Sequence, residues 1–192
     1  MKRLCVSILA FAALVLAAPF ASAQDTVNIF QNVTPIAIDA NAMTVEVQNR
    51  PPAEYPHVGY RAPVPLEQAL NMWAKSRFAM TGAGENTLRV TVRQADIVEK
   101  LLPVKKGIAG WFRKDQSAEY ALNVDIAVVL IDANGGQQGT ASATTTNSTT
   151  VPEGTTDAEK QAVWAEMMKK AFDSLDRELL PRVQQTIARG AG

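Results

Sequence analysis

Residues 122–136, LNVDIAVVLIDANGG, predict a long β-strand that ends in a hairpin turn. Apolar side chains occupy every second position in the first half of this stretch, which is the period of a strand with one buried face. Asn123 and Asp125 fall on the other face. Asn134 and Gly135 form the dipeptide that favours the tight turn of a β-hairpin. The chain should therefore turn back on itself directly after this strand.

The return arm, Gln137 to Val151, is built almost wholly from Thr, Ser, Ala and Asn. This composition is also found in disordered linkers, because it offers little apolar surface to bury. Its position after the turn favours a strand with hydroxyls on one face and small side chains on the other. Gly139, Ala141 and Ala143 would let a helix approach that second face closely. The hydroxyls of the first face, which we name the hydroxyl row, would come from Thr140, Ser142, Thr144, Thr146, Ser148 and Thr150.

Residues 156–180 predict an amphipathic helix. Thr156 and Glu159 have the spacing of a capping box, and Pro181 is expected to end or kink the helix. Charged residues, Asp176 among them, occupy most of the positions outside the apolar side and are expected to be solvated. The apolar side would be formed by Val163, Trp164, Met167, Met168, Ala171, Leu175 and Leu179.

Two further strands and a helix are predicted before the hairpin. Residues 36–47 alternate in polarity with a phase slip near Asn41, and residues 88–97 alternate with a second change of phase. Residues 66–81 place apolar side chains at helical spacing. The intervening segment, 49–65, is rich in proline, which blocks both helix and ladder hydrogen bonds, so we expect an extended connector.

One residue of the predicted helix and four residues of the connector have polar groups that the helix and strand patterns do not explain. Arg77 falls near the apolar stripe of the predicted helix, where we expect its stem to run past the core and its head to reach water. The connector could present a peptide-recognition ridge, or it could be a crossover pinned on the domain, which we favour. The residues concerned are Tyr55, His57, Tyr60 and Arg61.

The predicted order of elements is β-α-β-β-β-α, and each element has one apolar face. The packing that buries all these faces is an α+β two-layer sandwich, in which two helices lie on one face of a four-stranded, mainly antiparallel sheet. The opposite face of the sheet is expected to be polar and to meet either solvent or a partner. Besides the hydroxyl row, its polar residues are Arg89, Arg93, Asn123 and Asp125.

The first 23 residues predict an export signal. A basic pair precedes an uncharged apolar run, and Ala21-Ser22-Ala23 has the spacing at which a signal peptidase cuts. The apolar run is shorter than the roughly 20 residues of a transmembrane helix. We expect cleavage after Ala23 and a mature chain, residues 24–192, that forms one domain in the bacterial periplasm.

The residue types of the mature chain exclude several kinds of chemistry. Without the basic pair of the signal, 17 of the 19 basic residues remain against 19 acidic ones, a balance that argues against nucleic acid as a partner. The only cysteine, Cys5, lies in the signal, and the only histidine is His57. A cysteine nucleophile and a paired His or Cys metal site are therefore excluded. Paired carboxylates such as Asp96 with Glu99 are abundant in any soluble protein. We predict no enzymatic activity and no cofactor or metal.

Residues 101–117, which we name the basic aromatic loop, interrupt the strand pattern. An exposed Trp-Phe pair with basic neighbours can bind a membrane interface, because the rings insert at headgroup depth while the cations meet anionic lipid. The same composition is typical of protein-binding hot spots. The rings could also fold back as a small satellite core, and the sequence leaves the three alternatives open. The residues concerned are Lys105, Lys106, Trp111, Phe112, Arg113 and Lys114.

The order of elements behind a signal peptide resembles that of small envelope proteins, namely the lipopolysaccharide-assembly lipoprotein and the auxiliary lipoproteins of ABC-type transport systems. Three short motifs resemble uncharacterised secreted proteins of alphaproteobacteria: DQSAEY at 115–120, VPEG at 151–154 and LDREL at 175–179. The chain departs from the lipoprotein families because no lipobox cysteine precedes Gln24. The resemblance implies an accessory role without chemistry of its own.

We therefore expect a non-catalytic periplasmic accessory or scaffold protein that docks on a cell-envelope complex. The docking surface would be the basic aromatic loop, the polar sheet face, or both, and the partner would be an envelope protein. The alternative is a lipid- or amphiphile-binding protein that places Trp111 and Phe112 at a membrane surface. A carboxylate-dependent hydrolase is a third and weaker alternative.

Overall fold

The computed structural model describes residues 34–82, 85–103 and 115–188. The expected signal peptide and the six residues singled out in the basic aromatic loop lie outside these ranges. The strands are β1 (Ile36–Ile38), β2 (Ala42–Val47), β3 (Phe78–Met80), β4 (Thr87–Leu101), β5 (Gln116–Ile131) and β6 (Gln137–Pro152). The helices are α1 (Leu66–Arg77) and α2 (Asp157–Val183), with short helical turns at Gly59–Arg61 and Gln184–Ala188.

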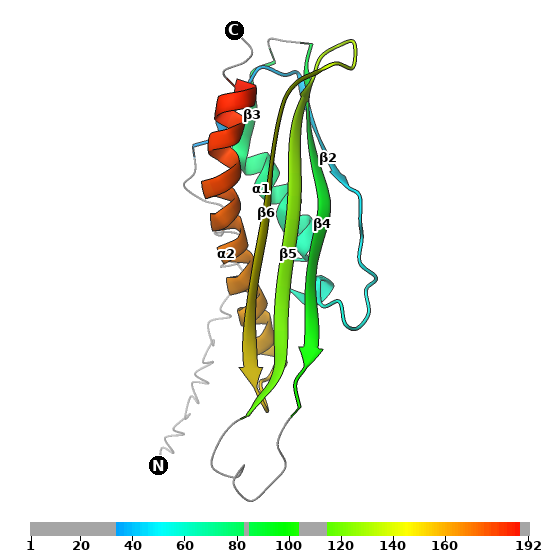
Figure 1. Ribbon diagram of the computed structural model, residues 1–192, viewed down its shortest axis with the longest axis vertical. Helices are drawn as coiled ribbons and strands as arrows, with labels where there is room; N and C mark the ends of the chain where they lie inside the picture. The colour runs from blue at the N-terminus through cyan, green and yellow to red at the C-terminus, as the bar shows by residue number, and fades with distance from the viewer. Residues whose placement is uncertain (1–33, 83–84, 104–114, 189–192) are drawn as a thin grey trace, which may run out of the picture.

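The predicted α+β sandwich is confirmed. Four strands form one sheet in the order β2-β4-β5-β6, and both helices lie behind it (Figure 1). The sheet is mixed, because β2 runs parallel to β4 whereas the other two pairings are antiparallel. The long strands β4, β5 and β6 extend along the molecule, so the face without helices is a long, open surface (Figure 1).

The hairpin of β5 and β6 forms as the sequence predicts. Every second side chain of β5, from Ala118 to Leu130, is buried. In the turn, Asp132 accepts hydrogen bonds from the backbone of Asn134 and Gly136, at 2.9 and 2.8 Å. The hydrogen bond from Gly136, followed by one from the Gln138 side chain, holds the pKa of Asp132 below its ordinary value. The Thr- and Ser-rich return arm is a strand over its whole length.

The segment 36–47 splits where the phase slip was predicted. Residues 36–38 pair with β3 in a separate two-stranded sheet, and residues 42–47 pair with β4 in the main sheet. The pairing with β1 also corrects one boundary, because it draws residues 78–80 into β3 and ends α1 at Arg77 instead of Thr81. The second predicted change of phase is confirmed as a bulge in β4 between Val92 and Gln94.

The core lies between the sheet and the two helices. Its largest buried side chains include Trp73 from α1, Trp164 from α2 and Tyr120 from β5. The rings of Tyr120 and Trp164 meet edge to face, with their centroids 5.5 Å apart. The predicted capping box of Thr156 and Glu159 is present at the start of α2, and this helix continues through Pro181 to Val183.

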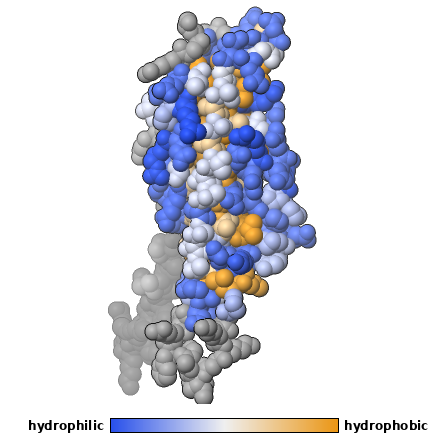
Figure 2. All heavy atoms as spheres, in the orientation of Figure 1, coloured by the Kyte–Doolittle hydropathy of each residue, from blue (hydrophilic) through white to orange (hydrophobic). Residues whose placement is uncertain are grey.

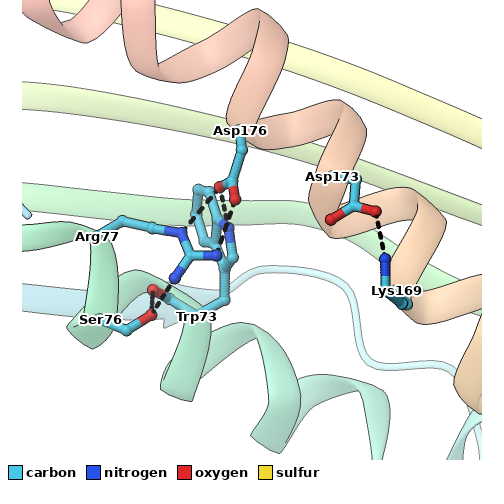
Figure 3. A network of polar contacts seen from close by, with 6 residues as sticks. All are labelled: Trp73, Ser76, Arg77, Lys169, Asp173 and Asp176. Atoms are coloured by element: carbon cyan, nitrogen blue, oxygen red, sulfur yellow. Dashed lines mark hydrogen bonds and ion pairs between the residues drawn. The ribbon is translucent and has the colours of Figure 1, made fainter. Parts of the chain in front are cut away.

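Two polar residues differ from expectation. Arg77 is not directed into water: it is 3% exposed and pairs with Asp176 of α2 (Figure 3). Asp176 was expected on the solvated side of its helix, but it also accepts a hydrogen bond from Trp73 Nε1 at 2.8 Å. Sequence periodicity places each residue on its own helix and gives no information about which helix packs opposite, so neither contact could be inferred.

Candidate functional site

Within the described residues, both helices pack on one face of the sheet and leave the other face open. We name it the helix-free face, and it consists of the outward side chains of β4, β5 and β6. The outward positions of β6 form the predicted hydroxyl row, and all six are exposed. Figure 2 shows a pale column with orange patches along the middle of this face, between hydrophilic flanks.

The four residues predicted for the polar sheet face all lie on the helix-free face. Arg93 Nη2 lies 2.9 Å from Asp125 Oδ1, which joins β4 to β5. Arg89 Nε lies 3.6 Å from Glu46 Oε1, which joins β4 to β2. Asn123 is paired in register with Asp96 of β4. The structure therefore brings these residues onto one surface, and their charges are partly neutralised within it.

The middle of the helix-free face is more apolar than predicted. Beyond Asn123 and Asp125, the outward positions of β5 include Ala121, Ala127 and Val129, and all three are half-buried. We name these three residues the apolar band. The expectation of a wholly polar face relied on two polar residues of this strand and overlooked that its outward positions turn apolar on either side of them. The three residues of the apolar band belong to this face and were missed by the prediction.

The basic aromatic loop starts and ends at the far end of the sheet from the Asn134-Gly135 turn. Leu102 N donates to Ser117 O at 2.9 Å, and this bond closes the last described rung between β4 and β5. Leu101, at the end of β4, is 65% exposed. The predicted roles of Lys105, Lys106, Trp111, Phe112, Arg113 and Lys114 remain predictions.

The connector carries a His-Asp pair that the sequence analysis did not bring together. His57 Nδ1 lies 2.5 Å from Asp96 Oδ2. Asp96 is buried on β4, and the connector backbone pairs with the same strand, because Val58 N donates to Ile97 O and Glu99 N donates to Pro56 O. The connector is thus attached to the sheet edge, as the favoured interpretation predicts.

A cavity of about 130 Å³ lies beside His57, between the connector, α1 and β4. A His-Asp pair next to a cavity can serve as a general base if a nucleophile lies within reach. Among the described residues that line this cavity, none is a serine, threonine or cysteine. The hydrogen bond between His57 and Asp96 links the connector to β4. The lining residues are Arg50, Pro51, Pro52, His57, Gly59, Tyr60, Pro65, Leu66, Glu67, Ala95 and Asp96.

Arg61 provides a second attachment of the connector. Its guanidinium carbon lies 5.6 Å from the centre of the Trp164 ring, and its Nη2 lies 3.5 Å from Asp157 Oδ1. Cation-π and ion-pair contacts of this kind hold the end of the connector against α2. The two tyrosines of the connector are exposed, Tyr55 at 59% and Tyr60 at 47%.

Within residues 34–82, 85–103 and 115–188, no group of three His, Cys, Asp or Glu side chains is arranged to hold a metal ion. In the same part of the chain, neither helix has the length and apolar character needed to span a bilayer.

No protein-family model and no curated protein matches this chain. Among solved structures, it is similar to a minor lipoprotein from Acinetobacter baumannii, with 14% sequence identity over 77% of this chain and 94% of that chain and a TM-score of 0.38. It is also similar to the rare lipoprotein B from Shewanella oneidensis, with 14% identity over 71% of this chain and 92% of that chain and a TM-score of 0.32. Both TM-scores are below 0.5, so these likenesses assign neither a family nor a function to this chain.

Proposed function

We propose that this protein is a non-catalytic accessory protein of the bacterial cell envelope that docks on a protein partner through the helix-free face. The observation that carries the proposal is the apolar band on β5, which Asn123 and Asp125 interrupt and which lies between the arginines of β4 and the hydroxyl row of β6. Protein interfaces have the same arrangement, with an apolar centre and a polar rim.

The energetics favour a protein partner on this face. Arg93 with Asp125, and Arg89 with Glu46, are already paired, so covering them removes less favourable hydration than covering isolated charges would. The hydroxyls of β6 can donate or accept hydrogen bonds at a partner surface. A lipid surface would gain little here, because the band is narrow and has polar groups on both sides.

The proposal can be tested by photocrosslinking in the bacterial envelope. A photoreactive residue at position 127 lies in the apolar band, and one at position 170 lies on the exposed side of α2 as the matched control. We expect one envelope protein to be captured from position 127 and not from position 170, and the capture to be lost in Val129→Arg. Equal capture from both positions would contradict the proposal.

Lipid binding through the basic aromatic loop is tested by a different change. Replacing both Trp111 and Phe112 with Ser should leave capture at position 127 unchanged if the helix-free face suffices for docking. Loss of binding to anionic liposomes, with the circular dichroism spectrum intact, would instead support the amphiphile-binding alternative. Unfolding of the double variant would assign the two rings to a satellite core.

A further inference from the structure

The edge strand β2 borders a groove that the proposed docking function does not use. This groove, which we name the β2-α1 groove, has a volume of about 580 Å³ and lies on the helix side of the sheet. Val45 and Val47 of β2 form one wall, and Met72 of α1 belongs to the other. The remaining lining residues are Arg50, Pro65, Glu67, Gln68 and Asn71.

The backbone of β2 directs hydrogen-bonding groups away from the sheet at this groove. Gln48 N donates to Val92 O of β4 at 2.9 Å. Backbone groups of successive residues in a strand point to opposite sides, so the N–H and C=O groups of Val47 and Val45 point away from β4. Within the described part of the chain, no hydrogen bond outside the sheet reaches these two residues.

The side chains of Val45 and Val47 lie on the helix side of β2. They are in register with Val90 and Val92 of β4, which belong to the buried core, and they are themselves half-buried. The same two residues therefore offer outward backbone groups and apolar side chains facing the groove.

Near the Asn134-Gly135 turn, two carbonyls of the opposite sheet edge are covered by side chains, as those of β2 are not. On β6, Thr140 O accepts a hydrogen bond from Thr186 Oγ1 at 3.1 Å, and Ser142 O accepts one from Arg182 Nη1 at 2.6 Å. Covering edge carbonyls with side chains prevents another strand from pairing there. At β2 the corresponding groups are left open beside a groove whose lining is half apolar and half polar.

We propose that the β2-α1 groove binds an extended segment of a partner polypeptide, which adds to β2 as a further strand. A polypeptide backbone is the ligand that matches outward N–H and C=O groups two residues apart. Alternate side chains of the segment would enter the groove against Val47 and Met72, so they should be apolar, and those between them can be polar. An acyl chain fits the apolar wall but leaves the backbone groups of Val45 and Val47 without partners.

Amide hydrogen exchange tests the free edge and its occupant in one experiment. In the protein alone, the amides of Val45 and Val47 should exchange faster than those of Glu46 and Gln48, which face β4. The probe is a synthetic peptide of alternating valine and threonine with lysines at both ends. We expect it to slow exchange at Val45 and Val47 by about tenfold or more. A peptide with the same sequence and N-methylated backbone should have no effect.

Two variants separate backbone pairing from groove contacts. Val45→Pro removes one outward N–H, a change that an edge strand tolerates, and it should abolish protection by the peptide. Met72→Glu leaves the β2 backbone intact and should weaken binding of the peptide, because it places a charge in the groove wall. Lys170→Glu on α2 should leave binding of the peptide unchanged. Unchanged protection in Val45→Pro and Met72→Glu, or no protection by the peptide in the unaltered protein, would overturn the proposal. So would protection that appears without peptide as protein concentration rises, because a second copy would then occupy the edge.

Discussion

Arg77 donates two parallel hydrogen bonds to Asp176, from Nε to Oδ1 at 2.9 Å and from Nη2 to Oδ2 at 2.8 Å (Figure 3). This contact joins α1 to α2 on the helix side of the sheet. The fork of a guanidinium matches the two oxygens of a carboxylate, which makes this geometry among the strongest of charged contacts. Trp73 donates to the same carboxylate, so Asp176 accepts three hydrogen bonds from two buried side chains of α1.

Asp176→Ala should lower the free energy of unfolding by about 3 kcal/mol, because it removes the carboxylate partner from a buried guanidinium. Asp173→Ala is the matched control, since Asp173 lies one turn away on the same helix and pairs with exposed Lys169 at 2.8 Å (Figure 3). That variant should leave stability nearly unchanged. Urea unfolding of both variants measures the difference, and similar losses would show that the buried pair contributes no more than the surface one.

Gly139→Ala should destabilise the fold by about 1–3 kcal/mol, because the space beside β6 is already filled. A Cβ on Gly139 would overlap the carbonyl oxygen of Thr186 and lie 3.1 Å from Ile187 Cγ1. Gly59→Ala is the control, since its Cβ would meet Ile97 N and Leu66 Cβ at ordinary distances of 3.6 and 3.7 Å. The midpoint of thermal unfolding should be clearly lower for Gly139→Ala than for Gly59→Ala. A lower midpoint for Gly59→Ala would contradict the close approach of Thr186 to Gly139.

The strands and helices were largely predictable, because each has an internal pattern in the sequence. The alternation of β5, the turn at Asn134-Gly135 and the capping box at Thr156 depend on neighbours in the chain and appear as expected. Small residues at 139, 141 and 143 correctly predicted that a helical segment approaches β6. The separate pairing of β1 with β3 was not predicted, because it depends on a partner 42 residues away.

The candidate surfaces were less predictable, because they depend on contacts between distant segments. His57 and Asp96 are 39 residues apart, and nothing in either local pattern indicates that they meet. The β2-α1 groove exists because α1 leaves one side of Val45 and Val47 uncovered, which only the packing of the helix determines. Arg89 and Arg93 lie on the open face, and their carboxylate partners were not foreseen.

Removing the charge of Arg93 should cost more stability than removing that of Arg89. Arg93 pairs at 2.9 Å with Asp125, whose side chain is 28% exposed, whereas Arg89 lies 3.6 Å from Glu46, which is more than half exposed. We expect Arg93→Gln to lower the free energy of unfolding by about 1 kcal/mol and Arg89→Gln by less than about 0.5 kcal/mol. Urea unfolding at low and high salt gives both values, and the Arg93 effect should shrink less in salt. Equal effects would mean that Asp125 is as well hydrated as Glu46.

Tyr120 should make the fold sensitive to alkaline pH. Burial, followed by the hydrogen bond from its hydroxyl to Glu99 Oε1 at 2.8 Å, raises the pKa of Tyr120 above its ordinary value of 10.0. The unfolded chain therefore releases this proton at lower pH than the folded chain does. Stability from this group is complete below pH 10 and falls as pH rises above it, by up to about 1.4 kcal/mol per pH unit.

Tyr120→Phe isolates this effect from the other groups that titrate at alkaline pH. The variant lacks the hydroxyl, so at neutral pH it should lose about 1 kcal/mol with the hydrogen bond to Glu99. At about pH 11 the difference in the free energy of unfolding between the two proteins should narrow or reverse. Only the protein with Tyr120 is destabilised there, because its unfolded chain releases the phenol proton more readily than its folded chain does. Urea unfolding of both proteins at the two pH values measures this difference. A constant gap would mean that Tyr120 ionises as readily in the folded protein as in the unfolded chain, and that its burial beside Trp164 does not disfavour the phenolate.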